Sequence, residues 1–272
     1  MGRFLAENFP PKSPVEDWVK AWADINGRPG TQAPNHGMAL WSRQDVVGAY
    51  LAIYSTRVID GRSERFCNLA VWCVSPGYRS GSIRMLNALL AQDGYHFTDL
   101  SPTPEVQRLN LRLGFRYLDP SSQLTLNLPW PTLPRRTRVS SDPDEIARVL
   151  TGEPLRYYQD HLRCRWARHA VIIADTASCY VQWRFERRRN LRWVAAIQYV
   201  SEPHLFRAGL LSLSRHLAFR HKALFTLVDQ HVVGGSFSPS ASLVGPPRRM
   251  FKSATLGPGD IDYLYSEITA AP

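Results

Sequence analysis

The spacing of apolar residues changes from the period of a strand to the period of a helix in the middle of the chain. The apolar run 66–74 is rich in residues that favour strands, and it ends at the breaker Ser75-Pro76-Gly77. Helical spacing then extends to residue 92. The stretch predicts a strand that leads into a helix through a tight polar turn.

A second strand and a second helix follow at once. Residues 95–100 predict a strand, and residues 105–113 predict a helix with Pro104 in its first turn. Gly114 is placed to cap the end of that helix, and a third strand begins with Phe115. The pattern of this central stretch is therefore strand, helix, strand, helix, strand.

The flanking regions also divide into elements. Before the central stretch we expect an amphipathic helix at 15–25 and a loop at 26–36. Two hairpin strands follow at 37–41 and 46–55, with their turn at 42–45, and a separator at 61–64 precedes the central strand. After the central stretch, the proline-rich segment 119–142 predicts a linker, with a short strand at 124–128 that finishes the first sheet.

The second half repeats the order of elements in the first. Helices are predicted at 143–150, with Ser141 or Asp142 as cap, and at 155–168. Strands are predicted at 170–174, 179–185, 192–200 and 223–229, with a helix at 205–220 before the last of them. The tail is predicted to contain a loop at 234–247, a strand at 248–252 and a helix at 258–268.

Two segments support an internal duplication. AAIQYVSEP at 195–203 aligns with LAVWCVSPG at 69–77. We interpret the chain as two domains of similar architecture, 1–134 and 135–272.

The turn VSPGYRSGS at 74–82, the helix after it and the ending LNLRLGFR at 109–116 resemble the GCN5-related N-acetyltransferase (GNAT) superfamily. The resemblance implies an α/β fold with two GNAT-like halves in tandem, each a mixed, mostly antiparallel sheet flanked by helices. It also implies acyl-CoA or acetyl-CoA as co-substrate, with the pantetheine arm lying between two parallel strands that splay apart.

The same resemblance implies where the co-substrate binds. Its pyrophosphate would lie at a helix start, where backbone N–H groups lack partners and the helix dipole attracts anions. The residues that would form this site are Arg79, Ser80, Gly81 and Ser82. Backbone N–H groups of Cys73 or Val74 would polarise the thioester carbonyl as its oxygen gains charge.

The chain departs from the family pattern at four positions. The usual small residues of the pyrophosphate turn are replaced by Ser82 and Arg84, and Arg84 places a long cation where close approach is required. Asn68 stands where some members keep a glutamate general base, and Asn110 where a tyrosine protonates the leaving thiolate. Amides do not transfer protons near neutral pH, so each would hold a carbonyl or a water, or serve as a structural amide.

Asp99 and Ser101 follow the second parallel strand, at the end where ligands of open α/β sheets collect. A buried carboxylate with a raised pKa is a competent base for an acceptor amine or hydroxyl. The alternative for Asp99 is a turn or helix-cap residue. Cys73 has no histidine near it in the sequence, which favours an inert thiol over a nucleophile.

The net charge of the 272 residues is +10, and it is unevenly placed. Residues 1–134 carry 13 Lys and Arg against 11 Asp and Glu, whereas residues 135–272 carry 20 against 12. This bias favours polyanionic partners such as CoA, an acidic acyl-carrier protein, tRNA or an anionic membrane surface. No apolar run approaches the roughly 20 residues that span a bilayer, and no signal peptide is visible, so we expect a cytoplasmic protein. The histidine spacing predicts no metal site.

We therefore expect an acyltransferase that moves an acyl group from acyl-CoA or acyl-carrier protein to an amine or hydroxyl, with its site in the first half. One alternative is an aminoacyl-tRNA-dependent transferase, because tandem GNAT-like domains also build the peptidoglycan-bridge enzymes. Another is a non-catalytic GNAT-like protein that binds a ligand or a partner. The second half has Glu202-Pro203-His204 in place of the turn, so we do not expect it to bind CoA.

Overall fold

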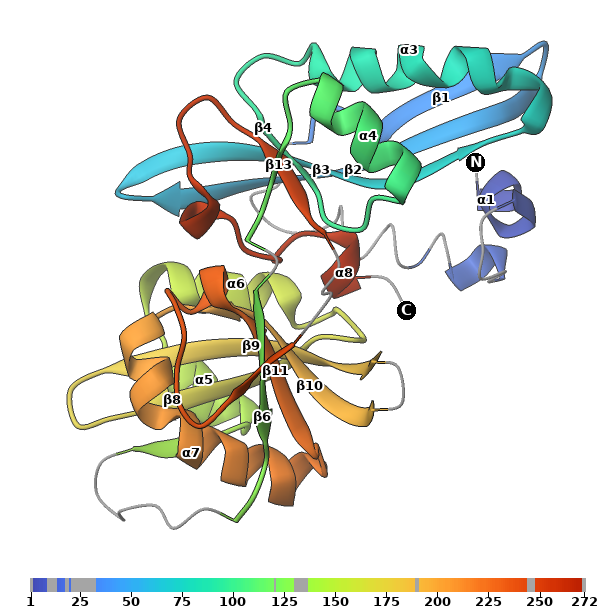
Figure 1. Cartoon of the computed structure of the whole chain (residues 1–272). Coiled ribbons are helices and arrows are strands. Elements are labelled where there is room, and N and C mark those ends of the chain that lie inside the picture. Colours follow the sequence, from blue (N-terminus) through green and yellow to red (C-terminus); the bar gives the residue numbers. More distant parts are fainter. Residues whose placement is uncertain are drawn as a thin grey trace. The chain divides into compact units, whose positions relative to one another are not determined.

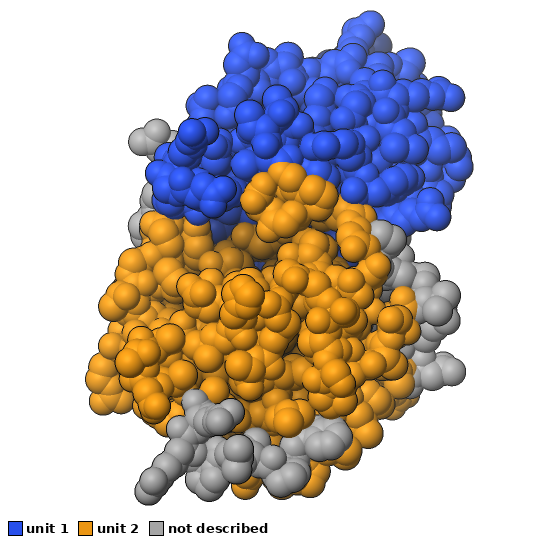
Figure 2. Space-filling model, turned by 60° about the vertical axis from the view of Figure 1, so that its left-hand side comes forward, with its two compact units in different colours: residues 1–117, 248–256, 265–272 blue, residues 118–247, 257–264 orange. Residues whose placement is uncertain are grey.

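The structure is a computed structural model that describes residues 2–8, 14–17, 20, 33–119, 121–129, 137–188, 191–243 and 248–270. The chain forms two compact units, coloured separately in Figure 2. Unit 1 comprises Met1–Tyr117, Arg248–Leu256 and Tyr265–Pro272. Unit 2 comprises Leu118–Pro247 and Gly257–Leu264. Each unit therefore contains segments that are distant in the sequence.

The described residues of unit 1 form a mixed sheet of six strands in the order β1-β2-β3-β4-β13-β5 (Figure 1). Its strands are β1 Gly37–Ser42, β2 Asp45–Ile59, β3 Arg62–Val74, β4 His96–Asp99, β5 Arg116–Tyr117 and β13 Met250–Lys252. Its helices are α1 Gly2–Asn8, α3 Arg79–Leu90, α4 Pro104–Arg112 and α8 Glu267–Ala270. Within this described sheet β3 and β4 are parallel, and the other neighbours are antiparallel.

Both faces of this sheet are buried against helices. The side chains of Tyr50, Ala52 and Tyr54 in β2 join the core formed with α3 and α4. Ala49 and Leu51, which alternate with Tyr50 and Ala52 in sequence, pack with α1 on the opposite face. Alternate side chains of a strand point to opposite faces, so a strand covered on both sides is apolar at nearly every position. The unbroken apolar run of β2 is the consequence.

The turn between β2 and β3 is shorter than expected. Asp60 (φ 48) and Gly61 (φ 75) both have left-handed backbone, as in the two-residue turns that favour the Asp-Gly pair. The separator expected at 61–64 is therefore reduced, because Arg62 and Glu64 already continue the β3 ladder.

The described residues of unit 2 form a mixed sheet of seven strands in the order β12-β6-β11-β10-β9-β8-β7. Its strands are β6 Ser122–Leu126, β7 Arg138–Ser140, β8 Arg168–Ile173, β9 Ser178–Arg188, β10 Leu191–Val200, β11 Phe225–Asp229 and β12 Ala241–Leu243, and its helices are α5 Pro143–Val149, α6 Gly152–His161 and α7 Pro203–His221. The parallel pair β10 and β11, joined by α7, repeats the connection of β3 and β4 through α3. The predicted fold class, two mixed and mostly antiparallel sheets with flanking helices, is confirmed.

Two strands belong to a different sheet from the one that their place in the sequence predicts. The strand expected at 124–128 to finish the first sheet is β6, which pairs antiparallel with β11 and β12 in unit 2. In unit 1 its counterpart is β13, which pairs with β4 and β5. Main-chain hydrogen bonds to distant segments decide this placement, and a local pattern does not encode them. A single boundary at residue 134 therefore does not coincide with the two units.

Two helices are shorter than the apolar pattern predicts. The helix expected to reach residue 168 is α6, which ends at His161. The closing helix expected at 258–268 is replaced by the 3-10 turn η3 Pro258–Asp260 and the start of α8. Tyr265 (φ 53) has left-handed backbone between them, which a right-handed helix does not admit.

Three other predictions concern loops and caps. Asp142, rather than Ser141, caps α5, because its side chain accepts a hydrogen bond from the Glu145 N–H at 2.9 Å. The loop expected at 234–247 contains the short strand β12. The helix expected at 15–25 lies mostly outside the described residues.

Candidate active site

The parallel strands β3 and β4 separate near the middle of unit 1. They pair at three positions, the last of which is Asn68 with Thr98. β4 ends one residue later at Asp99, whereas β3 continues to Val74 with β2 as its neighbour. In the described structure, residues 69–74 of β3 have no strand paired to the backbone edge that faces away from β2. We call this backbone edge the open edge.

A β-bulge interrupts β3 just beyond the point of separation. The ladder pairs Leu69 with Ala52 and Val71 with Leu51, so Ala70 is an extra residue in β3. Bulges are frequent next to active sites, where they redirect backbone groups and side chains. The bulge lies two residues beyond the last pairing of β3 with β4.

Beyond the bulge, the phase of the ladder sets the direction of each backbone N–H. The Ser75 N–H donates to the Val47 carbonyl at 2.9 Å, and hydrogen-bonded positions alternate along an antiparallel pair. The Cys73 N–H therefore points toward β2. The N–H groups of Trp72 and Val74 point to the open edge.

Two of the predicted catalytic residues meet in a direct hydrogen bond. Asp99 is the last residue of β4, Asn110 lies in α4, and both are buried. Nδ2 of Asn110 donates to Oδ2 of Asp99 at 2.8 Å. The Asn110 amide therefore orients the strand-end carboxylate.

Ser101 connects Asp99 to a second carboxylate. The backbone N–H of Ser101 is close enough to the Asp99 carboxylate to lower the pKa of that carboxyl. Its Oγ donates to Oε1 of Glu267 at 2.7 Å, although Glu267 lies 166 residues later in the chain. The C-terminal segment of unit 1 thus supplies a buried carboxyl beside the predicted site residues.

Asn68, the third predicted catalytic residue, also contacts Glu267. Its Nδ2 donates to Thr98 Oγ1 at 3.0 Å, and its Oδ1 accepts from the Glu267 N–H at 3.4 Å. Both ends of the amide are used within the protein. Asn68 therefore fixes the position of Glu267, which agrees with the structural alternative considered for this amide.

The pattern of the sequence does not single out Glu267. Its partners Asn68 and Ser101 belong to the first half of the chain, and nothing in the local spacing relates them to it. The one available signal is a carboxylate in the mostly apolar and aromatic segment 261–268.

Both carboxyls titrate close to neutral pH. Burial raises the pKa of Asp99 to about 7, against the opposing effect of the hydrogen bonds from Asn110 and the Ser101 N–H. Burial raises the pKa of Glu267 to about 8; the bond from Ser101 and the charge of Arg249 oppose this shift, and the charge of Asp99 adds to it. Because repulsion between nearby carboxylates is mutual, the two do not ionise together readily. The cluster therefore holds a proton that is exchangeable near pH 7.

Buried atoms without partners occur in this cluster and further along β3. Among the described residues, Oε2 of Glu267, Oδ1 of Asn110 and Nε1 of Trp72 are buried and make no hydrogen bond. The ring of Trp72 stacks on Tyr50, with centroids 4.7 Å apart. An unpaired buried polar group costs about 1–3 kcal/mol, so a ligand that bonded to these atoms would recover that energy. The two oxygens call for an N–H or O–H donor.

The predicted pyrophosphate site is the start of α3. Arg79 and Ser80 are exposed, the first turn has no acidic residue, and no side chain caps the helix. Ser82 donates its hydroxyl to the Arg79 carbonyl at 2.6 Å. Gly81 also has a packing role, since a Cβ there would lie 2.7 Å from Cδ2 of Leu40. The helix start is thus cationic and free of competing carboxylates.

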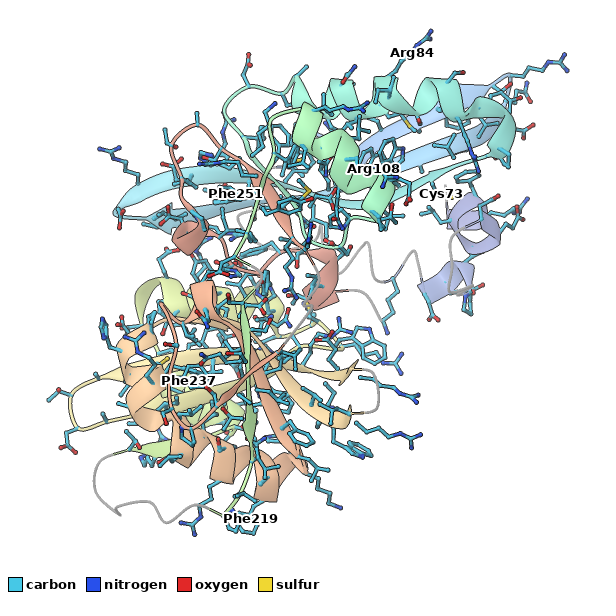
Figure 3. All side chains as sticks on the ribbon, in the orientation of Figure 1. Cys73, Arg84, Arg108, Phe219, Phe237 and Phe251 are labelled. Carbon is cyan, nitrogen blue, oxygen red and sulfur yellow. The ribbon has the colours of Figure 1, made fainter. Side chains whose placement is uncertain are left out.

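Arg84, the departure that places a cation in this turn, does not obstruct the helix start. Its side chain is exposed and points away from the sheet in Figure 3. A long side chain at this position is therefore compatible with an anion at Arg79.

Cys73 and Val74 lie far from the carboxyl pair. Val74 is six residues beyond Asn68, which corresponds to roughly 20 Å along a strand. The Sγ of Cys73 donates to the Asn8 carbonyl at 3.4 Å, and burial raises the pKa of this thiol, so it is not a nucleophile. A thioester carbonyl polarised at Cys73 or Val74 would lie out of reach of a base at Asp99, and that role needs correction.

The corresponding place in unit 2 has different chemistry. Asp229 ends β11 as Asp99 ends β4. The hydroxyls of Ser122 and Tyr263 donate to its two carboxylate oxygens. A carboxylate held by two protein donors is typical of a structural role.

Two further properties concern the described residues as a whole. They contain no cluster of three or more His, Cys, Asp or Glu side chains that is arranged to hold a metal ion. They also contain no helix that is both long and apolar enough to cross a membrane.

No protein-family model matches the sequence, and no curated protein matches it significantly. Solved structures do match. A conserved protein of unknown function from Enterococcus faecalis, named as a probable N-acyltransferase, is 12% identical with a TM-score of 0.58, and the match covers 94% of this chain and 70% of that one.

Two proteins named GCN5-related N-acetyltransferase are also similar. The one from Anabaena variabilis is 14% identical with a TM-score of 0.54, over 92% of this chain and 69% of that one. The one from Kribbella flavida is 15% identical with a TM-score of 0.53, over 92% and 66%. At these identities the likeness concerns the fold. The chain therefore has the fold of the GNAT superfamily.

Proposed function

We propose that unit 1 is an acyltransferase, which moves an acyl group from an acyl-CoA or acyl-carrier-protein thioester to an amine or hydroxyl. The observation that carries this proposal is Asp99, a buried carboxyl with a pKa of about 7 at the point where two parallel strands separate. Ligands of open α/β sheets bind at such strand ends, and a base with this pKa is matched to proton transfer near neutral pH. The GNAT-like fold supports the same activity.

The thioester would lie along the open edge with its carbonyl near the bulge at Ala70. This residue is two positions beyond Asn68, or roughly 7 Å, so a carbonyl carbon there is within reach of an acceptor bound at Asp99. The N–H groups of Trp72 and Val74 would then bond to the amides of the pantetheine arm. This arrangement replaces the expectation that Cys73 or Val74 polarises the carbonyl.

The pyrophosphate would lie at the start of α3, whose first residue, Arg79, comes five residues after Val74. Exposed Arg79 and the first N–H groups of the helix provide positive charge there. Ser80, Gly81 and Ser82 would line the same turn. The order of these sites along the chain matches the order of pyrophosphate, pantetheine and thioester in an extended acyl-CoA.

Asp99 would act as the general base. The acceptor nitrogen or oxygen attacks the carbonyl carbon while its proton passes to the Asp99 carboxylate, which Asn110 orients. The carbon–sulfur bond then breaks and the thiolate leaves with the electron pair. The proton on Asp99 passes to the thiolate or to water. Thiolates are good leaving groups, so an amide at Asn110 in place of a tyrosine is compatible with the reaction.

The first experiment is thermal unfolding of the purified protein with acetyl-CoA, long-chain acyl-CoAs, acyl carrier protein and bulk tRNA added separately. A ligand that binds only the folded state stabilises it by about 2.7 kcal/mol at a hundredfold excess over its Kd. A higher Tm with one class of thioester identifies the donor, and thiol release then reports transfer to candidate amines and alcohols. An unchanged Tm with every thioester contradicts the proposal.

A pair of variants tests the anion site. The double variant Arg79→Ala, Ser82→Glu removes a cation and adds an anion at the helix start, so it should lose the Tm increase with CoA esters. The control Arg62→Ala removes an equally exposed cation at the other end of β3 and should keep it. Equal affinity in both variants would remove this site from the proposal.

An aminoacyl-tRNA-dependent transferase is the second candidate, because residues 135–272 carry 20 Lys and Arg against 12 Asp and Glu. It predicts copurifying RNA and binding that weakens steeply with salt. A Tm increase with tRNA alone would favour it. No increase with any of these ligands would favour a non-catalytic GNAT-like protein that binds another ligand or a partner.

A further inference from the structure

We propose that Glu267 is a positioning residue of the site in unit 1, where it forms a proton-sharing pair with Asp99 and sets the charge of the carboxylate that receives the acceptor's proton. The role rests on the proposed acyl transfer. The pair itself is a property of the protein alone, so it can be tested without any substrate.

Ser101 links the two carboxyls from a single residue. Its side-chain Oγ donates to Oε1 of Glu267 at 2.7 Å, and its backbone N–H is close enough to the Asp99 carboxylate to lower the pKa of that carboxyl. The Glu267 N–H also bonds to Asn68, which pairs with Thr98, the residue before Asp99. These contacts with Ser101 and Asn68 are the geometric basis of the pair.

The segment before Glu267 is shaped to bring its carboxyl to this place. Tyr265 has a left-handed backbone (φ 53), which a non-glycine residue keeps only where the surrounding structure requires it. Ser266 and Thr269 are each 1% exposed, so the segment is anchored on both sides of Glu267. The Glu267 N–H bonds to Asn68, which fixes the residue to β3. A carboxylate that only capped a surface helix would need none of this burial.

The groups around the pair come from several elements. Arg249, which precedes β13, lowers the pKa of Glu267. Tyr50 faces the pair from β2, and its phenol stays protonated because burial first, and then the charges of Asp99 and Glu267, raise its pKa. One guanidinium and one neutral phenol near two carboxyls favour a state with one ionised and one protonated carboxyl.

The pair then carries one proton and one negative charge before reaction. When the acceptor attacks the thioester, its proton moves to Asp99, and the pair becomes neutral with two protons. Release of one proton to the departing thiolate or to water restores the starting state. Oε2 of Glu267 has no hydrogen-bond partner among the described residues, so it is available to carry the retained proton. Glu267 thereby leaves Asp99 ionised and ready to act as the base.

The test is a carbon-13 NMR titration of the side-chain carboxyl carbons in protein labelled at Asp and Glu. The variants are Asp99→Asn and Glu267→Gln, which keep the side-chain shapes, and the control is Glu105→Gln, an exposed carboxyl at the start of α4. Asp99→Asn should lower the titration midpoint of Glu267 by about one pH unit or more, because it removes the charge that opposes ionisation of Glu267. Glu267→Gln should leave the midpoint of Asp99 nearly unchanged, because Glu267 is still protonated while Asp99 titrates. The control should move neither midpoint.

An unchanged Glu267 midpoint in Asp99→Asn, or ordinary acidic midpoints for both carboxyls in the parent protein, would overturn the pair. If Asp99→Asn does not fold, the midpoints of both carboxyls in the parent protein still decide the question. Coupled titration without acyl transfer from any thioester would keep the pair and remove the proposed function. Conversely, an active enzyme whose pH profile of kcat/KM is the same with Glu267→Gln would remove the positioning role and keep the function.

Discussion

Asn110 in α4 donates its side-chain amide to the carboxylate of Asp99 at the end of β4, with 2.8 Å between Nδ2 and Oδ2. This bond joins Asn110 to the carboxyl that we propose as the general base. It also explains why an amide suits this position. A neutral donor orients the Asp99 carboxylate and adds no second titrating group.

Replacing Asn110 should weaken unit 1 in a pH-dependent way. A hydrogen bond to a charged acceptor is worth about 1.5–3 kcal/mol, and one to a neutral acceptor about 0.5–1.5 kcal/mol. Since the pKa of Asp99 is about 7, Asn110→Ala should cost about 1 kcal/mol more above pH 8 than below pH 6. Urea unfolding at both pH values measures the difference. The control Asn87→Ala, at an exposed position of α3, should show no such dependence.

Removing the Asp99 carboxyl should make the protein more stable at alkaline pH. Burial raises the pKa of Asp99 from 3.8 to about 7 on folding, so the folded state binds more protons than the unfolded state between these values. The stability of the parent protein is therefore intact below the unfolded pKa, falls as the pH rises through the folded pKa, and is then constant. The difference corresponds to about 4 kcal/mol at most.

The gain in stability of Asp99→Asn over the parent should accordingly grow between pH 4 and pH 8. Unfolding free energies measured across this range give the comparison. A gain that is the same at every pH would show that Asp99 has an ordinary pKa in the folded protein.

Asp99→Asn should also abolish most catalysis once a donor and an acceptor are known. General-base catalysis contributes roughly 10²–10⁴-fold, so kcat should fall by this factor with little change in KM for the thioester. The control Asp93→Asn alters an exposed carboxylate just before β4 and should retain full activity. Steady-state kinetics of thiol release measure both. Full activity of Asp99→Asn would assign the base to another residue.

Gly37 and Gly77 should respond very differently to alanine. Gly37 has φ 112, and a Cβ there would lie 2.1 Å from the Tyr50 carbonyl oxygen, in backbone that cannot move aside cheaply. Gly37→Ala should cost roughly 2–4 kcal/mol of unfolding free energy. Gly77 has an ordinary φ and open space around its Cβ position, so Gly77→Ala should be nearly neutral. Chemical denaturation of the two variants tests the contrast.

The local pattern of residues predicts an element correctly where residues within that element decide where it begins and ends. The breaker at Ser75-Pro76-Gly77 separates β3 from α3 as predicted, and Gly114, with φ 85, lies just past the end of α4. Asp99 and Asn110 were both candidates because of their places at a strand end and on a helix. Their direct contact follows from the packing of α4 beside β4, which the pattern does not contain.

The sequence by itself determined the types and order of most elements, the family-like turn at 74–82 and four members of the carboxyl cluster, Asn68, Asp99, Ser101 and Asn110. Only the tertiary structure decided that β6 and β13 join sheets distant from their neighbours in sequence, and that Glu267 completes the cluster. The physical reason is the same in both cases. Periodicity records which face of an element is buried, but a main-chain ladder or a buried carboxyl needs a particular partner, and any of several distant segments could have supplied it.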